Sequence, residues 1–219
     1  MSPRPTRRSV LAASAGTAAG IALPHLFIPR YGWTANSRLG VGSIGVGGKG
    51  TEDGNQAAGQ GKMIACADVH LGNANRFAGQ HKCEVYQDYR KLLERKDIDV
   101  VTCGTTDHWH VKISLDAMKA GKDVFCQKPL TLTIDEGKVI GDAVKKYQRV
   151  FQVGTQQRSE FDRRFLKAVA MCRGGRLGKK LKARVQTGGA PGGGPFKEGE
   201  PPKELDWEMY SGQAPKHPF

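Results

Sequence analysis

The stretch Arg38-Leu-Gly-Val-Gly-Ser-Ile-Gly-Val-Gly-Gly-Lys-Gly50 reads as an apolar strand that runs into a glycine-rich turn. Three of its glycines, Gly45, Gly47 and Gly50, stand at the spacing G-x-G-x-x-G. In a dinucleotide site the first allows a tight turn, the second lets a pyrophosphate approach the backbone, and the third lets the next helix pack close to the strand. Free N–H groups and the dipole at the start of that helix attract phosphate. A plain glycine-rich turn is the alternative, because the chain has 29 glycines.

The sequence beyond this turn continues the same unit. Residues 51–61 are compatible with a polar helix, and Lys62-Met-Ile-Ala-Cys-Ala-Asp68 reads as a short apolar strand that ends in an acid. Asp68 follows Gly50 by 18 residues, near the place where such a unit has the carboxylate that binds the adenosine ribose. Because this carboxylate would repel a 2′-phosphate, the sequence favours NAD over NADP. A simple turn residue at the strand end is the alternative role of Asp68. The residues predicted to bind this half of the cofactor are Gly45, Val46, Gly47, Gly48, Lys49, Gly50 and Asp68.

Strand-like and helix-like segments alternate from residue 38 to residue 154. The expected strands are 38–46, 62–68, 83–86, 98–103, 122–126 and 150–153, and the expected helices are 48–60, 71–80, 89–95, 107–120 and 134–147. This alternation predicts an α/β fold, a Rossmann-type doubly wound parallel sheet over residues 36–154. Residues 155–219 are expected to be an incomplete second, α+β domain, with a helix at 160–172, a strand at 180–186 and neither helix nor strand from residue 205 onward.

Residues 1–35 have the pattern of an export signal. Arg7 and Arg8 precede an uncharged segment, residues 12–23, that is rich in alanine and glycine. The paired arginines resemble the twin-arginine signal, and the apolar segment is short for a membrane span. We predict export to the periplasm through the twin-arginine machinery, with a membrane-tethered protein as the outcome if the signal is not cleaved. A short membrane anchor or a disordered basic tail is the alternative.

Charge and cysteine content bear on other classes of partner. The formal net charge is +13 at pH 7, and residues 1–50 hold six bases and no acid. A second acid-free run, residues 163–197, holds ten bases but only two aromatic residues, so it offers little for stacking nucleic-acid bases and no nucleic-acid partner is predicted. The five cysteines are odd in number and never at C-x-x-C spacing, which indicates neither a disulfide framework nor a zinc site. No metal site is predicted, because His108 and His110 would not share one helix face.

Two polar stretches follow predicted strands at the edge where a doubly wound sheet binds its ligand. One is Cys103-Gly-Thr-Thr-Asp-His-Trp-His110, and the other is Cys126-Gln-Lys-Pro-Leu130. A lysine directly after a buried strand can serve as a general acid or base. Lys128 is therefore a candidate catalytic residue, with a solvated loop residue as the alternative.

Together these stretches resemble the Gfo/Idh/MocA oxidoreductases, a family named for glucose–fructose oxidoreductase and inositol dehydrogenase. Its members carry G-x-G-x-x-G, then T-P-x-x-H, then A-G-K-x-V-x-x-E-K-P. The corresponding stretches here are Gly45–Gly50, Thr105–His110 and Ala120–Pro129. Phe151–Arg158 is also similar to exported members, and the resemblance covers roughly residues 38–215.

The resemblance implies NAD(P)-dependent hydride transfer at a hydroxyl-bearing carbon of a sugar, cyclitol or related polyol. It gives Lys128 the catalytic role beside the nicotinamide, where a lysine polarises a carbonyl or moves the hydroxyl proton. It also implies a possible homo-oligomer formed through a complete C-terminal domain. The further cofactor-binding residues that it implies are Thr105, Thr106, His108, His110, Gln127, Lys128 and Pro129.

The chain departs from the family pattern at three places. Gln127 stands where the family has glutamate, which removes a charge beside Lys128, and Thr106 replaces the usual proline. The histidine-bearing D-x-x-x-H motif of the family's substrate domain has no equivalent after residue 160. We therefore expect residues 155–219 to be the beginning of a substrate domain, in a truncated gene product or one piece of a split pair. A nucleotide-binding fragment without catalysis, as a sensor or degenerate relic, is the alternative function.

Overall fold

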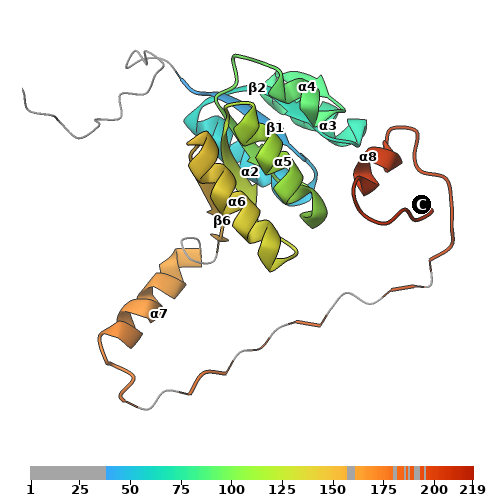
Figure 1. Cartoon of the computed structure of the whole chain (residues 1–219). Coiled ribbons are helices and arrows are strands. Elements are labelled where there is room, and N and C mark those ends of the chain that lie inside the picture. The colour runs from blue at the N-terminus through green and yellow to red at the C-terminus, as the bar shows by residue number, and fades with distance from the viewer. Residues whose placement is uncertain are drawn as a thin grey trace, which may run out of the picture. The chain divides into compact units, whose positions relative to one another are not determined.

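The computed structural model divides the chain into two units, residues 1–37 and 38–219, and the account below concerns the second (Figure 1). The residues that it describes are 38–156, 161–179, 182–184, 186, 188–189, 193–194 and 196–219. The export signal predicted for residues 1–35 lies outside this part of the chain. Within the described residues, no helix is both long enough and apolar enough to cross a membrane.

Six parallel strands form one sheet in the order β3-β2-β1-β4-β5-β6. They are β1 (Gly40–Ile44), β2 (Lys62–Ala67), β3 (Glu84–Tyr86), β4 (Val100–Cys103), β5 (Asp123–Gln127) and β6 (Phe151–Gly154). This is the strand order of the Rossmann fold, and the predicted doubly wound sheet is confirmed. The order reverses between β1 and β4, so the carboxyl ends of these two strands flank the crevice in which such sheets bind ligands.

Helices connect the strands and begin at residues suited to starting them. They are α2 (Gly48–Gln60), α3 (Leu71–His81), α4 (Tyr89–Leu93), the short 3-10 turn η1 (Asp107–Trp109), α5 (His110–Lys119) and α6 (Ile134–Tyr147). The Asp88 side chain caps α4, and Thr133 with Glu136 forms a reciprocal capping box at the start of α6. These elements match the predicted segments to within a few residues at each end.

Two apolar clusters fill the two faces of the sheet. One lies under α2 and α3 and is built around the fully buried Phe77. The other lies under α4, α5 and α6 and includes Leu92, Ile113 and Met118. Because helices cover both faces, the central strands are apolar on both sides, as parallel sheets require.

The region after β6 agrees less well with the sequence analysis. The predicted helix is present as the turn η3 (Phe161–Arg163) and α7 (Arg164–Arg173), although Phe165 and Val169 on its apolar face are exposed. The strand expected at 180–186 is wrong for the described residues 182–184 and 186, which are irregular, and the remaining positions of that segment lie outside the description. An isolated strand leaves its backbone groups unpaired, and none of the described strands pairs with this segment.

A helix near the C-terminus was not expected. Helix α8 (Trp207–Ser211) begins at Asp206, whose Oδ1 accepts a hydrogen bond of 2.9 Å from the Met209 N–H. Just before it, Leu205 forms a single antiparallel bridge with His70, between β2 and α3. Residues 205–219, for which no helix or strand was predicted, thus contain a helix and a contact with the Rossmann domain.

Candidate functional site

The turn between β1 and α2 has the geometry that the glycine spacing predicts. Gly45 has φ +74°, and a Cβ there would lie 2.8 Å from the backbone nitrogen of Thr105. A Cβ on Gly50 would lie 1.8 Å from the carbonyl oxygen of Gly45, so only glycine lets α2 approach β1 this closely. Gly47 precedes α2 and provides no side-chain cap. The start of α2 therefore presents backbone N–H groups to a ligand at the carboxyl edge of the sheet.

Asp68 ties the end of β2 to this turn. Its Oδ2 accepts a hydrogen bond of 2.8 Å from the Val46 N–H, and its Oδ1 accepts one of 2.9 Å from the His70 N–H. Each carboxylate oxygen keeps a second lone pair that can accept a hydrogen bond from a hydroxyl group. The guanidinium of Arg76 donates to the carbonyl of Val46 over 3.1 Å, which places a cation on the same turn.

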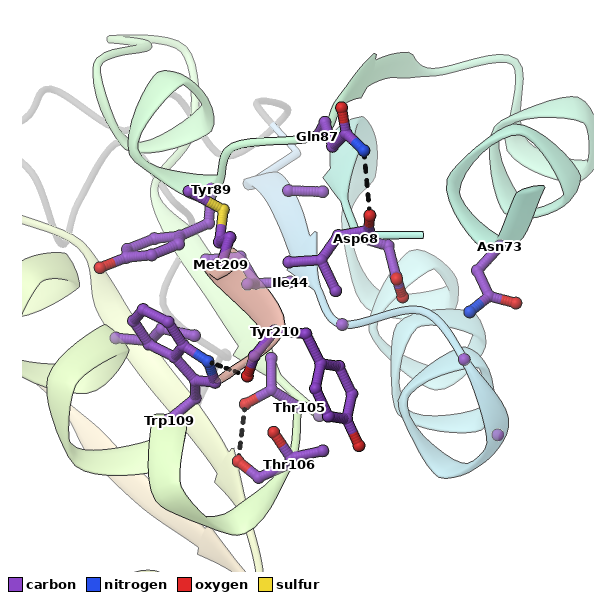
Figure 2. A pocket seen from close by; sticks show the side chains of 17 residues that line it. Ile44, Asp68, Asn73, Gln87, Tyr89, Thr105, Thr106, Trp109, Met209 and Tyr210 are labelled. Atoms are coloured by element: carbon purple, nitrogen blue, oxygen red, sulfur yellow. Dashed lines mark hydrogen bonds between the residues drawn. The ribbon is translucent and has the colours of Figure 1, made fainter. Parts of the chain in front are cut away.

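A cavity of about 260 Å³ opens beside the turn (Figure 2). Its polar walls include Asp68, Asn73, Gln87, Thr105 and Thr106. Its apolar and aromatic walls include Ile44, Tyr89, Trp109, Ile113, Met209 and Tyr210. The volume lies below the roughly 300–1,000 Å³ of pockets that enclose a drug-sized ligand, so the cavity suits one part of a dinucleotide.

Tyr89 forms an uncharged aromatic wall of this cavity. Burial, together with a hydrogen bond of 2.7 Å that its hydroxyl donates to Asp116 Oδ2, raises the pKa of Tyr89. The ring of Trp109 meets it edge to face, with 5.7 Å between the ring centroids. These two side chains give one end of the cavity the flat apolar surfaces on which an aromatic ligand packs.

The C-terminal segment, residues 204–213, lies across the carboxyl ends of β2 and β4. Its Asp206 N–H donates to the carbonyl of Val69 over 3.0 Å, just after β2. At the other end, the Tyr210 carbonyl accepts 3.0 Å from Trp109 Nε1. Through these bonds, residues more than a hundred positions from the glycine turn become walls of the same cavity.

Further contacts join the loop after β4 to its neighbours. The Nε2 of His108 lies 2.9 Å from the same Tyr210 carbonyl, so its imidazole holds the C-terminal segment. His110 is buried, and its ring nitrogens lie 2.5 Å from the carbonyl of Pro129 and 3.2 Å from that of Thr105. In this structure His110 links the loops that follow β4 and β5.

A family model described as "Oxidoreductase family, NAD-binding Rossmann fold" matches residues 39–155. The chain belongs to the Gfo/Idh/MocA oxidoreductase family. The match includes the glycine turn, Asp68 and the loops after β4 and β5. The family suggested by the sequence motifs is therefore confirmed.

Relatives in this family include named dehydrogenases. The inositol 2-dehydrogenase of Azotobacter vinelandii is 32% identical over 149 residues, which are 65% of this chain and 44% of that protein. The levoglucosan dehydrogenase of Pseudarthrobacter phenanthrenivorans is 36% identical over 99 residues, covering 44% of this chain and 25% of that protein. A crystal structure of a probable dehydrogenase from Thermotoga maritima matches with a TM-score of 0.58 at 27% identity, covering 64% of this chain and 42% of that one. The chain thus spans less than half the length of each of these relatives.

Lys128, the lysine of this family member's K-P pair, follows β5 directly. Its side chain is exposed, and its peptide bond to Pro129 is cis. The buried Gln127 accepts a hydrogen bond of 2.8 Å from the Lys128 N–H through its Oε1. Its Nε2 donates over 2.7 Å to Asp53 Oδ2, and Lys49 Nζ lies 3.5 Å from the other Asp53 oxygen. The backbone of Lys128 is thereby tied to α2, while its side chain faces solvent.

The cavity gathers only part of the predicted site. The predicted residues that line it are Gly45, Gly47, Gly48, Asp68, Thr105 and Thr106. The predicted residues outside its lining are Val46, Lys49, Gly50, His108, His110, Gln127, Lys128 and Pro129. Several of these shape the site indirectly, as Gly50 does through close packing and Val46 through its bond to Asp68. For the others, cofactor contact stays a prediction.

Sequence reasoning missed the aromatic side of the cavity. Trp109 lies within the polar stretch Cys103–His110, but no role was predicted for its ring. Met209 and Tyr210 come from a segment with a helix-capping aspartate, yet nothing in the sequence says where that helix docks. The described residues also contain no group of three or more histidine, cysteine, aspartate or glutamate side chains placed to hold a metal ion.

Proposed function

We propose that this chain is the cofactor-binding part of an NAD-dependent dehydrogenase that transfers a hydride to or from a hydroxyl-bearing carbon of a sugar, cyclitol or related polyol. The observation that carries the proposal is the contact between the glycine turn after β1 and Asp68 after β2, in which the Val46 N–H donates to the Asp68 carboxylate over 2.8 Å beside the switch point of the sheet. The named relatives, inositol 2-dehydrogenases and a levoglucosan dehydrogenase, support the class of substrate.

The residues present fit a nicotinamide dinucleotide. Gly45 and Gly50 keep side chains out of the turn, so backbone N–H groups at the start of α2 can bind the pyrophosphate. The Asp68 carboxylate can accept hydrogen bonds from the hydroxyls of the adenosine ribose. Its negative charge disfavours binding of a 2′-phosphate. When bound, the nicotinamide supplies or accepts the hydride. Lys128 holds or moves the proton of the substrate hydroxyl. Its side chain is exposed, so a substrate that approaches from outside this domain can reach it.

Calorimetric titration of the purified chain with NADH tests the cofactor part of the proposal. We expect saturable binding with one site per chain and competition by AMP. A titration without saturable heat at millimolar NADH would contradict it. A second assay uses a chimera in which this chain is extended to the full length of its relatives. If the chain binds NADH but the chimera oxidises no polyol, the chain is a nucleotide-binding fragment without catalysis.

We also propose that the protein is exported through the twin-arginine route. The support is Arg7-Arg8 before the uncharged residues 12–23. Replacing both with lysine, Arg7→Lys and Arg8→Lys, is expected to trap a tagged protein in the cytoplasm. Unchanged recovery of the double variant from the periplasm would rule this route out.

A further inference from the structure

We propose that the C-terminal segment, residues 204–213, is a built-in wall of the adenine subsite, with the ring of Tyr210 packing against the adenine base. The inference rests on the proposed function, because it assumes that the dinucleotide binds at the glycine turn. Met209 and Tyr210 line the same cavity as Asp68 and the glycine turn (Figure 2). A ribose held by Asp68 places its attached base within that cavity.

The chemistry of the walls suits an adenine ring. Trp109 and Tyr89 supply aromatic surfaces on one side, and Ile44 and Met209 supply apolar ones. Adenine is flat and stacks favourably on such surfaces. Asn73, Gln87 and the two threonines of the loop after β4 give the cavity polar groups that can meet the ring nitrogens and the ribose.

Contacts with other aromatic side chains hold the Tyr210 ring in place. It stacks on Trp207 with 5.1 Å between centroids and an interplanar angle of 13°. Trp207 is fixed in turn by a hydrogen bond of 3.0 Å from its Nε1 to the carbonyl of His217, and by the ring of Phe219, 5.1 Å away. This support lowers the loss of side-chain entropy when a ligand packs on the tyrosine.

The segment is also held against the Rossmann domain at both ends. At its beginning the Leu71 N–H donates to the carbonyl of Glu204 over 2.9 Å. Near its end Gly212 has φ +53°, and a Cβ on it would lie 2.3 Å from Cζ2 of Trp109. Only glycine therefore lets the chain after α8 pass this closely over the Trp109 ring.

Three variants and three ligands test the inference by calorimetry. Tyr210→Ala is expected to weaken binding of both AMP and NADH by about tenfold, the loss typical of one base–aromatic stack. Tyr210→Phe keeps the ring and is expected to bind within about twofold of the unaltered chain. Glu208→Gln, at an exposed position on α8, is the matched control and is expected to change neither affinity. Nicotinamide mononucleotide, which lacks adenine, is expected to bind Tyr210→Ala as it binds the unaltered chain.

Gly212→Ala tests the same inference by changing the path of the backbone after α8. Its new Cβ would displace the segment from Trp109, so we expect it to weaken AMP binding as Tyr210→Ala does. Circular dichroism and the thermal midpoint show whether each variant keeps the Rossmann fold. Unchanged AMP affinity in folded Tyr210→Ala would overturn the inference and leave the proposed function intact. Tighter AMP binding would also overturn it, since the segment would then compete with the nucleotide. Failure of the unaltered chain to bind NADH would count against the proposed function itself.

Discussion

The side chains of Gln127 and Asp53, at the end of β5 and within α2, form a buried hydrogen bond of 2.7 Å in which the glutamine amide donates to the carboxylate. This bond gives the glutamine, which stands where the family motif has glutamate, a buried partner. A glutamate at position 127 would bring two carboxylates into contact away from water, where like charges repel strongly. Glutamine keeps the hydrogen bond and the support of the Lys128 N–H without that repulsion.

Gln127→Glu is accordingly expected to destabilise the fold at pH 7 by about 1–3 kcal/mol. The carboxylate pair would raise the pKa of one carboxyl above its unfolded value. The stability of the variant is then lost as the pH rises through that folded pKa, and the deficit shrinks as the pH falls toward 5. Urea unfolding at pH 7 and pH 5 measures this. The double variant with Asp53→Asn restores a donor opposite the glutamate and should recover most of the loss; equal stability of Gln127→Glu and the unaltered chain would refute the argument.

Two glycines of α2 give a matched pair of predictions. Gly50→Ala is expected to cost more than about 2 kcal/mol and to abolish NADH binding, because its Cβ would lie 1.8 Å from the carbonyl oxygen of Gly45. Gly59→Ala meets nothing within 4 Å and is expected to stabilise the helix by up to about 1 kcal/mol. Thermal unfolding compares the two. A similar midpoint for both variants would show that the approach of α2 to β1 is not tight.

Asp68 and Arg76 are expected to set the preference between NAD and NADP in opposite directions. At about 5 Å from a 2′-phosphate, the Asp68 charge should disfavour NADP by about 1–3 kcal/mol at intermediate dielectric. Arg76, which donates to the carbonyl of Val46 on the same turn, partly offsets it. Titration with both cofactors should show that Arg76→Gln widens the preference for NAD and Asp68→Asn narrows it. Equal affinity of the unaltered chain for the two cofactors would remove the basis of this assignment.

The sequence predicts the sheet and the glycine turn well because both depend on short-range patterns. Gly50 and Asp68 are recognisable from spacing alone, since a close helix–strand approach and a strand-end carboxylate recur at fixed positions in a βαβ unit. The pairing of Gln127 with Asp53 joins residues 74 positions apart, and nothing local announces it. The docking of Tyr210 over the cavity likewise depends on contacts with Val69 and Trp109, which lie about a hundred or more positions earlier in the chain. Such long-range contacts bring Met209 and Tyr210 to the cavity and lie beyond pattern reasoning.

Lys128 is expected to matter for chemistry and little for cofactor binding. Its side chain is exposed and is not part of the cavity lining, whereas the turn and Asp68 hold the phosphates and the ribose. Lys128→Met keeps the length of the side chain and removes its charge and protons. In the chain as it stands, NADH affinity should change by less than about twofold, while Asp68→Ala, the matched loss of a charge in the cavity, should weaken it by about tenfold or more.

Turnover tests the other half of the Lys128 prediction. Joining this chain to the remaining length of the Azotobacter vinelandii inositol 2-dehydrogenase gives a chimera whose oxidation of a polyol panel can be measured with and without Lys128→Met. Loss of a positioned acid or base should lower kcat by roughly 10²–10⁴-fold. Because the side chain is exposed and its backbone N–H bonds to Gln127 in either variant, the folded state and the NADH affinity should stay the same. Turnover within a few-fold of the unaltered chimera would make Lys128 a plain loop residue. A collapse of NADH binding together with turnover would make it structural, and in either case the proton-transfer role falls.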